Sequence, residues 1–456
     1  MAKTKKHDAD MTEGTIWRLL VDFALPMCIG LVFQQLYNTV DTIVVGRFVG
    51  KEALAAVGST GSIINMLVSV SSGLSSGATV LISQHYGAHN EKRLSDAVQT
   101  TIVLTFILSI VITILGILLV DPMLRLMSTP EDVFEMSHQY VTIYYAGIIG
   151  LLFYNMGSGI MRAVGDSKRP LYFLILSAVL NTILDVIFVA VFGLGVAGVA
   201  YATIIAQIVS ALLILYVLTK TDAAYRIRWK ALCFSKPELG KIVSIGLPTS
   251  IQQAVTSFSN TFVQAYINIL GSTFMAGWST YGKLDGYVLL PMQAIALASA
   301  TFVGQNYGAN KFARARKGVN VSLLLSEIVT VFLGILVWIF APQLMLIFTE
   351  DEEVIGIAVN LIRIITPFYV CNCVNQIYAG ALRGIGKATM PTIAMLASFV
   401  AFRQIYLFFM KMFLGGTDAY ITGVSLAYPS GWIVCTLLML IFYRRSVLFK
   451  KGDPEA

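Results

Sequence analysis

Charged side chains are scarce in this sequence. Only 12% of the 456 residues are charged, whereas 57% are hydrophobic, and the mean hydropathy is +0.76. Soluble domains carry about 25% charged residues, so this scarcity excludes a large water-soluble enzyme. Apolar residues form runs, such as 102–120 and 196–218, that are long enough to cross the ~30 Å hydrocarbon core of a bilayer. The sequence therefore predicts a polytopic membrane protein.

Motifs of several catalytic and ATP-driven classes are also lacking. No GxxxxGK[ST] phosphate loop occurs, since the nearest segment, Gly384 to Lys387, is followed by Ala388, and direct drive by ATP is not expected. There are only four His and neither HExxH nor GxSxG occurs, which excludes the usual metal and serine hydrolases. The five cysteines contain no CxxC pair, so no disulfide framework or zinc site is indicated. We expect no enzymatic activity and no cofactor.

The net charge of +7 arises mainly at the ends of predicted helices. Most of the 32 Lys and Arg lie in the two tails and in alternate loops, while the intervening loops are acidic or neutral, as at 350–353. This is the positive-inside pattern, and it predicts a multi-pass protein of the cell inner membrane with both termini cytoplasmic. The polar N-terminal segment has no cleavage site and is interpreted as a tail. Nucleic-acid binding would gather the charge on one soluble face, so lipid is the expected surrounding and no nucleic acid the expected partner.

An all-α fold of twelve transmembrane helices is predicted, six in each half. The expected spans are 17–47, 54–82, 95–120, 134–161, 170–192, 195–219, 240–270, 273–303, 318–341, 354–382, 389–414 and 420–443. The corresponding domains are a cytoplasmic N-terminal tail (1–16), an N-lobe (17–219), a cytoplasmic linker (220–239), a C-lobe (240–443) and a cytoplasmic C-terminal tail (444–456).

The two halves repeat each other in sequence. Gln84-His85-Tyr86-Gly87-Ala88 returns as Gln305-Asn306-Tyr307-Gly308-Ala309, and the same shift carries Arg162 to Arg383, Gly165 to Gly386 and Pro170 to Pro391. Six helices per half make the repeats parallel, so substrate is expected between two pseudo-symmetric lobes that rock against each other. A duplicated scaffold without transport is the alternative. Pro26 and Pro248, at matching places in the first helix of each half, are candidate hinges or static kinks.

Two carboxylates of the first lobe lie within predicted membrane spans, where an ionisable group costs at least ~2.5–3.5 kcal/mol. Counting from the helix ends at 1.5 Å per residue puts Asp41 about 9 Å and Asp185 and Thr203 about 12 Å deep. The i,i+4 spacing adds Tyr37 beside Asp41 and Asn181 beside Asp185. These oxygen donors suit a hard cation or a shared proton. The alternative is that each carboxylate is fixed by interhelical hydrogen bonds.

The second lobe differs in its buried charges. By the repeat, Asp41 corresponds to Val263 and Asp185 to Tyr406, so both carboxylates are missing there. This lobe instead carries Lys283, Asp285, Glu327, Arg363 and Arg403 within predicted helices. We expect these charges to pair, with Asp285 and Arg403 as the first pair. The alternative is that they face the substrate cavity.

Several segments together resemble the multidrug and toxic compound extrusion (MATE) family of transporters. They are Tyr37-Asn38-x-x-Asp41, the two QxYGA segments, Met161-Arg162-Ala163-x-Gly165-Asp166, Asn181-x-x-x-Asp185 and the segment from Gly195 to Thr203. The resemblance spans essentially the whole chain. It implies two six-helix lobes in a V-shaped arrangement that export amphipathic or cationic organic compounds by antiport with Na⁺ or H⁺. We expect the transporter to be a monomer.

The resemblance also implies roles for individual residues. In the DinF-like branch, which has its cation site in the N-lobe, the coupling residues correspond to Tyr37, Asp41, Asn181, Asp185 and Thr203 here. Na⁺ would be held at Asp41, Asn181, Asp185 and Thr203. Gln34 and Asn155 match polar positions of the family's substrate cavity, and Lys283, Asp285 and Arg403 are further candidate cavity residues under the alternative to charge pairing given above. The other branch has acidic coupling residues on the seventh, eighth and tenth helices, and of these only Asp285 is present.

Two other functions fit the sequence less well. A lipid-linked precursor flippase of the same superfamily commonly has two further helices and a cationic central cavity, and neither is evident. An intramembrane prenyl- or glycosyl-transferase would need a DxxD cluster at a loop to hold a metal-bound diphosphate, and none occurs. Export by antiport is therefore the expected function.

Overall fold

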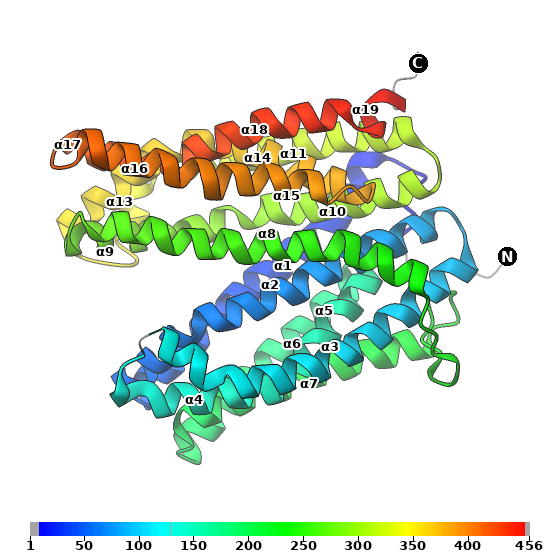
Figure 1. The fold of residues 1–456 in the computed structure, drawn as a ribbon, viewed down its shortest axis with the longest axis horizontal. Coiled ribbons are helices and arrows are strands. Elements are labelled where there is room, and N and C mark those ends of the chain that lie inside the picture. Colours follow the sequence, from blue (N-terminus) through cyan, green and yellow to red (C-terminus); the bar gives the residue numbers. More distant parts are fainter. Residues whose placement is uncertain (1–8, 128, 452–456) are drawn as a thin grey trace. The chain divides into compact units, whose positions relative to one another are not determined.

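The computed structural model describes residues 9–127 and 129–451, and every regular element in these residues is a helix (Figure 1). Of the predicted tails, residues 1–8 and 452–456 lie outside the described residues. The first half contains α1 (Ile16–Phe48), α2 (Lys51–Gly87), α3 (Glu91–Leu126), α4 (Glu131–Ala146), α5 (Ile148–Ala163), α6 (Lys168–Asp185), the π-helix η1 (Val186–Val191) and α7 (Gly195–Lys220).

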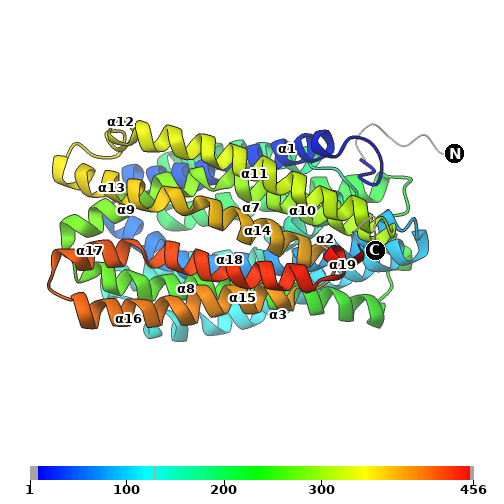
Figure 2. The ribbon, with the colours of Figure 1, turned by 90° about the horizontal axis from the view of Figure 1, so that it is seen from above.

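The second half begins after a connection that holds a short 3-10 turn, η2 (Trp229–Ala231). Its helices, which Figure 2 shows from another side, are α8 (Lys236–Asn268), α9 (Ser272–Val288), α10 (Leu290–Gly308), α11 (Phe312–Ile339), α12 (Ala341–Met345), α13 (Glu352–Ile365), η3 (Thr366–Phe368), α14 (Tyr369–Gly384), α15 (Thr389–Leu396), the π-helix η4 (Ala397–Phe402), α16 (Arg403–Leu414), α17 (Asp418–Ser425), α18 (Ala427–Arg445) and α19 (Val447–Lys451).

The predicted all-helical membrane fold is confirmed. Among the described residues, ten helices are long and apolar enough to cross a membrane, or eleven when α4 and α5, bent by 48°, count as one span. The remaining predicted span matches α8, which has 33 residues but a high content of Ser, Thr, Gln and Asn. Each predicted span thus coincides with one helix or with a consecutive series of helices, and the chain is a multi-pass membrane protein.

The duplication is visible in the backbone as well as in the sequence. Residues with positive φ recur at equivalent places of the two halves: Gly50 and Gly271, His89 and Asn310, Gly165 and Gly386, and Gly195 and Gly416. A left-handed backbone is costly for residues other than glycine, so it is adopted only where a turn requires it. The two halves therefore turn in the same way between their helices.

The chain folds as two compact units. Unit 1 comprises Ile29–Ser250 with the described residues before Met11, and unit 2 comprises Met11–Cys28 and Ile251–Ala456. Each unit therefore includes the beginning of the other half's first helix. Residues 16–28 of α1 belong to unit 2, and residues 236–250 of α8 belong to unit 1.

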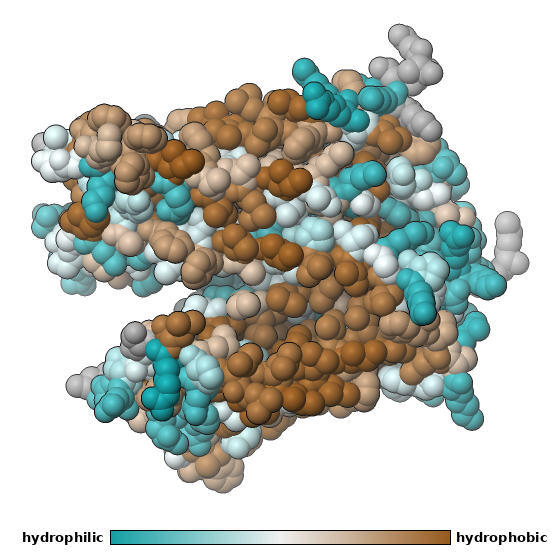
Figure 3. Space-filling view, in the orientation of Figure 1, coloured by the Kyte–Doolittle hydropathy of each residue, from teal (hydrophilic) through white to brown (hydrophobic). Residues whose placement is uncertain are grey.

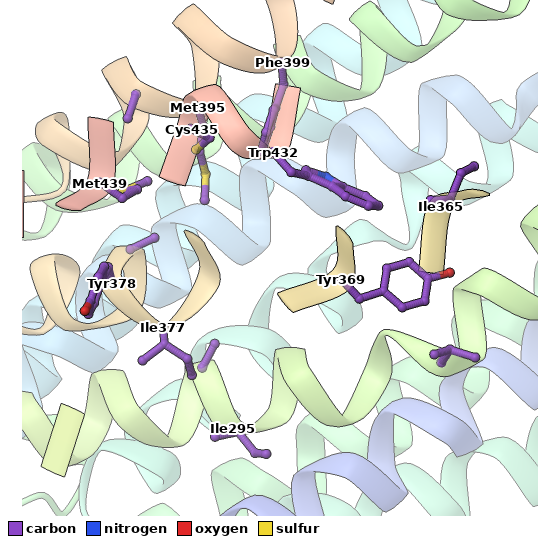
Figure 4. Packing of buried hydrophobic residues seen from close by; sticks show 14 of the residues in the cluster. Ile295, Ile365, Tyr369, Ile377, Tyr378, Met395, Phe399, Trp432, Cys435 and Met439 are labelled. Atoms are coloured by element: carbon purple, nitrogen blue, oxygen red, sulfur yellow. The ribbon is translucent and has the colours of Figure 1, made fainter. Parts of the chain in front are cut away.

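Both units bury apolar clusters and expose apolar side chains outward. In unit 2, Leu20 of α1 joins a cluster that includes Tyr369 and Trp432, whose ring centroids are 5.8 Å apart (Figure 4). In unit 1, Phe106 and Leu118 of α3 are 53% and 68% exposed, and apolar side chains gather over this helix in Figure 3. An outer surface of this kind matches a hydrocarbon surrounding.

Candidate functional site

The polar cluster of unit 1 begins on the second part of α1. The i,i+4 spacing puts Tyr37 and Asp41 on one face of the helix, and Gln34 lies one turn earlier. Tyr37 donates a hydrogen bond from its hydroxyl to Oγ1 of Thr203 on α7, at 3.2 Å. The α1 face is thereby joined to α7 through the predicted residues.

Asn181 and Asp185 occupy the last two turns of α6, and both are completely buried. Asn181 Nδ2 donates to Thr203 Oγ1 at 3.4 Å, so Thr203 accepts from both α1 and α6. The π-helix η1 starts directly after Asp185. Single π-helical turns are frequent at functional sites because they change which residues face the interior.

The carboxyl groups of Asp41 and Asp185 interact directly with each other, and Asp41 also interacts with Tyr37. All five predicted coupling residues therefore lie together in unit 1. Depth counting from the helix ends had suggested this arrangement, because α1, α6 and α7 each present their polar groups at a similar distance from the same helix ends.

Four buried oxygens of this cluster have no hydrogen-bond donor in the protein: Asp41 Oδ1, Asn181 Oδ1 and both carboxylate oxygens of Asp185. A buried acceptor without a donor normally costs about 1–3 kcal/mol, and more when it is charged. For Asp185, the interhelical interaction is with the other carboxyl group, Asp41, and not with a separate protein donor. The oxygens are suited to a proton or a small cation.

Two tyrosines missing from the predicted site lie beside these carboxyl groups. Tyr140 and Tyr144 of α4 are buried, and both interact electrostatically with Asp41. The hydroxyl of Tyr144 accepts a hydrogen bond from Gln207 Nε2 of α7 at 3.4 Å. Their i,i+4 spacing in a membrane span was a usable signal, but tyrosine is so frequent at membrane interfaces that the pattern alone did not single them out.

The two predicted cavity residues of unit 1 have different surroundings. Gln34 is exposed on α1 and lies two turns before Asp41 on the same face. Asn155 of α5 is half-buried, and its Nδ2 donates to Ser71 Oγ of α2 at 3.1 Å. Gln34 is therefore available to a ligand, whereas the Asn155 amide already binds α2.

In unit 2, Asp285 does not pair with Arg403, and that prediction was wrong. Asp285 Oδ1 accepts hydrogen bonds from Tyr281, at 3.0 Å, and from Tyr369. No ion pair to Asp285 is formed in the part of the chain that the structure describes. Tyrosine hydroxyls satisfy the carboxylate because α9 and α14 bring them nearer than any cation.

Arg403, directly after the π-helix η4, is also stabilised without a carboxylate. Its Nη2 donates to Ser259 Oγ at 3.1 Å and to Asn260 Oδ1 at 2.7 Å, and its guanidinium lies 4.7 Å from the ring centroid of Tyr428. Hydrogen bonds and a cation–π contact thus replace the expected ion pair.

Lys283, Glu327 and Arg363 are likewise not joined in ion pairs within residues 9–127 and 129–451. Lys283 Nζ lies 5.9 Å from the Phe348 ring centroid, and Arg363 lies 5.5 Å from that of Trp338. Glu327 has one buried oxygen without a donor. The expected pairing of charges in the second half is therefore not observed.

No group of three or more His, Cys, Asp or Glu side chains that could hold a metal ion is present among the described residues. The cluster of unit 1 has only two carboxylates, and its other oxygens come from hydroxyl and amide groups. Such a donor set is typical of a weakly held monovalent cation or a proton, since divalent ions generally recruit more carboxylates.

Comparison with known proteins gives a consistent result. The family profile described as MatE matches residues 26–187 and 248–406. "Probable multidrug resistance protein YoeA" of Bacillus subtilis is 31% identical over 443 residues, covering 95% of this chain and 94% of the relative. "Probable multidrug resistance protein NorM" of Thermotoga maritima is 29% identical over 385 residues, covering 82% and 81%. A solved structure described as the "outward-facing conformation of a multidrug resistance MATE family transporter of the MOP superfamily" matches with a TM-score of 0.91 at 26% identity, covering 98% of this chain and 100% of that chain.

Proposed function

The chain belongs to the MatE family of multidrug transporters, and from this premise we propose that it is a secondary antiporter. It exports amphipathic organic compounds, cationic or aromatic, and takes up Na⁺ or H⁺ in exchange. As a family member it is a transporter and not an enzyme. The small organic substrate class follows from the multidrug resistance proteins to which it is similar.

One observation carries the coupling part of this proposal: Asp41 and Asp185 interact directly in a buried setting, and Asp41 Oδ1 and both oxygens of Asp185 have no protein donor. Two adjacent carboxylates at low dielectric repel each other unless a cation or a proton neutralises them. Occupancy of the site therefore changes the local charge and, with it, the preferred spacing of α1 and α6.

Either coupling ion fits the donor set. Na⁺ would be held by the carboxylates of Asp41 and Asp185 with the oxygens of Asn181 and Thr203, all of which are hard donors. H⁺ would be shared between the two carboxylates, with Tyr37 as a hydrogen-bonding neighbour. In both cases the coupling site lies in the first half, as in the DinF-like branch.

The coupling cycle proceeds through α1. Entry of the cation from outside neutralises Asp41, α1 moves toward α6, and the substrate loses contacts that include Gln34. Asn155 of the first half, and Lys283, Asp285 and Arg403 of the second, are the other proposed cavity residues. Release of the cation to the cytoplasm restores the repulsion and prepares the next cycle.

Pro26 and Pro248 are proposed as the hinges of this movement. Each lies inside a long helix and two residues before the boundary between the units, at Cys28 and Ser250. Proline lacks the N–H that would bond to the preceding turn, so bending costs less there. The two units would then alternate access while the other helices move as rigid bodies.

The transporter is proposed to lie in the cell inner membrane as a monomer surrounded by lipid, with both termini in the cytoplasm. The distribution of Lys and Arg supports this orientation. The proposed lobes 17–219 and 240–443 follow the two sequence repeats. Units 1 and 2 differ from these lobes because the start of α1 belongs to unit 2 and the start of α8 belongs to unit 1.

The decisive experiment is efflux of a fluorescent organic cation from proteoliposomes under an imposed gradient of Na⁺ alone or of pH alone. We expect one of the two gradients to accelerate efflux by the wild type. Asp41→Asn should remove that acceleration while leaving substrate binding measurable.

Asp121→Asn is the matched control, because Asp121 is an exposed carboxylate on α3 that pairs with His138 at 3.3 Å. It should retain the gradient response. Efflux by Asp41→Asn that still follows the same gradient would refute coupling at Asp41.

A further inference from the structure

The two QxYGA segments have no part in the proposed coupling site, yet they are the most evident sequence repeat. We propose that they are crossed anchors, each of which holds the segment that begins the first helix of the opposite repeat. The segment at the end of α2 holds the start of α8, and the segment at the end of α10 holds the chain that enters α1.

The first anchor is a pair of buried ionisable side chains. His85 Nε2 lies 2.8 Å from Oε2 of Glu238, which belongs to the first turn of α8. The two side chains are 9% and 5% exposed, respectively. A hydrogen bond to a charged group in such a setting is among the stronger polar contacts in proteins. The contact lies entirely within unit 1.

The second anchor uses the equivalent residues but a different chemistry. Met11 N–H donates to Gln305 Oε1 at 2.8 Å, and Asn306 Nδ2 donates to the carbonyl oxygen of Met11 at 3.1 Å. Gln305 and Asn306 are completely buried. Arg314 adds hydrogen bonds to the carbonyl oxygens of Glu13 and Gly14. Unit 2 thus binds the backbone of the entering chain from Met11 to Gly14.

Formation of the helix end explains only part of the motif. The residues after QxYGA, His89 and Asn310, have φ values of 51° and 59° and terminate α2 and α10. Glycine and a left-handed residue are sufficient for such an ending. His85 Nε2 instead contacts Glu238 and Gln305 Oε1 contacts Met11, while Asn306 Nδ2 donates both to Met11 and to the Phe302 carbonyl oxygen of its own helix.

Beyond the first anchor, α8 continues in close contact with α2. A Cβ on Gly73 would lie 2.5 Å from the backbone nitrogen of Ser250, and one on Gly77 would lie 2.4 Å from the carbonyl oxygen of Ile242. Two glycines four residues apart permit this approach, as in membrane helices that associate through GxxxG. The contact with α2 reaches Ser250, the last residue of α8 in unit 1.

These contacts divide the first helix of each repeat into a part that is held by one unit and a part that is free to move relative to that unit. Residues 236–250 of α8 remain with unit 1, and residues 11–28 remain with unit 2, so movement between units is absorbed beyond them. This statement about movement rests on the proposed function, in which the two units alternate access to the substrate. The anchoring itself does not.

The anchors are tested by hydrogen–deuterium exchange of the full-length protein in nanodiscs. His85→Ala is expected to raise the amide exchange rates of residues 236–250 about tenfold, because loss of one charged hydrogen bond makes local opening about ten times more frequent. The exchange rates of residues 251–268 should not change. Glu238→Ala should do the same, and the double variant should add no further increase. Asn306→Ala should act likewise on residues 11–20.

A second variant and a transport measurement separate anchoring from general stability. Glu238→Gln keeps a hydrogen-bonding group and should have a smaller effect than Glu238→Ala. In proteoliposomes, both should lower kcat with KM unchanged. His138→Ala, which removes the more exposed histidine–aspartate pair, is the control and should change neither quantity.

Three results would overturn the proposal. They are unchanged exchange at 236–250 in His85→Ala, additive effects in the double variant, and increased exchange spread evenly over unit 1. Because exchange is measured without substrate or a gradient, a failed antiport mechanism leaves this test intact.

Discussion

Replacement of Asp185 by asparagine should make the protein more stable and at the same time insensitive to the coupling ion. Asp185 is completely buried, and neither of its carboxylate oxygens has a protein donor. A charged residue within a membrane span costs about 2.5–3.5 kcal/mol. Asparagine removes the charge, but its buried amide still lacks hydrogen-bond partners. The net effect is that the folded state becomes more stable by about 1–2 kcal/mol. Without the coupling ion, Asp185→Asn should therefore unfold at a higher temperature than the wild type.

Saturation with the ion should reverse this order. A ligand at 100 times its Kd stabilises the folded state by about 2.7 kcal/mol, and only the wild type has the site. The assay is thermal unfolding in detergent, with Na⁺ titrated at constant pH and ionic strength, and with pH titrated in the absence of Na⁺. The two unfolding curves should cross in one titration and not in the other, which identifies the ion.

Asp285→Asn is the control for a membrane-embedded aspartate that already has donors, from Tyr281 and Tyr369. It should be destabilised and should keep the response to the ion. An Asp185→Asn protein that is stabilised by the ion as strongly as the wild type would refute the assignment of the site.

Two further predictions concern unit 1. Gly77→Val should lower the unfolding temperature well below that of Gly61→Val, because a Cβ at Gly77 would lie 2.4 Å from the Ile242 carbonyl oxygen whereas nothing lies within 4 Å at Gly61. Equal stability of the two variants would contradict the close helix contact. Burial and the neighbouring Asp96 raise the pKa of the Cys233 thiol, so less thiolate is present at neutral pH and alkylation of a variant that retains only Cys233 should be slow. Asp96→Asn should lower that pKa and accelerate alkylation, and an unchanged rate would show that Asp96 has no influence.

The cluster of residues proposed for coupling could be predicted from the sequence because its signals are local. Hydropathy places Asp41 and Asp185 inside membrane spans, and the helical repeat puts Tyr37 and Asn181 on the same faces. Similar distances from the helix ends then suffice to predict that these groups meet. Tyr140 shares only its i,i+4 spacing with Tyr144, and this signal is weak because an aromatic residue in a membrane helix is ordinary until its neighbours are known.

The second half shows the limit of the same reasoning. Equal numbers of cations and anions suggested ion pairs, but pairing depends on the rotation of each helix and on what lies between the charges. Tyr281 and Tyr369 reach Asp285, while Arg403 meets Asn260 and Tyr428. Composition counts charges without showing which neutral groups can satisfy them.

The sequence alone determined the membrane environment, the series of helical spans and the duplication, because each depends on residues near one another in the chain. The partners of the QxYGA segments were decided only by the tertiary structure. His85 meets Glu238 across 153 positions, and Gln305 meets Met11 across 294. No local pattern encodes such contacts. They arise because the start of each first helix packs with the other repeat, where burial and hydrogen bonding stabilise it.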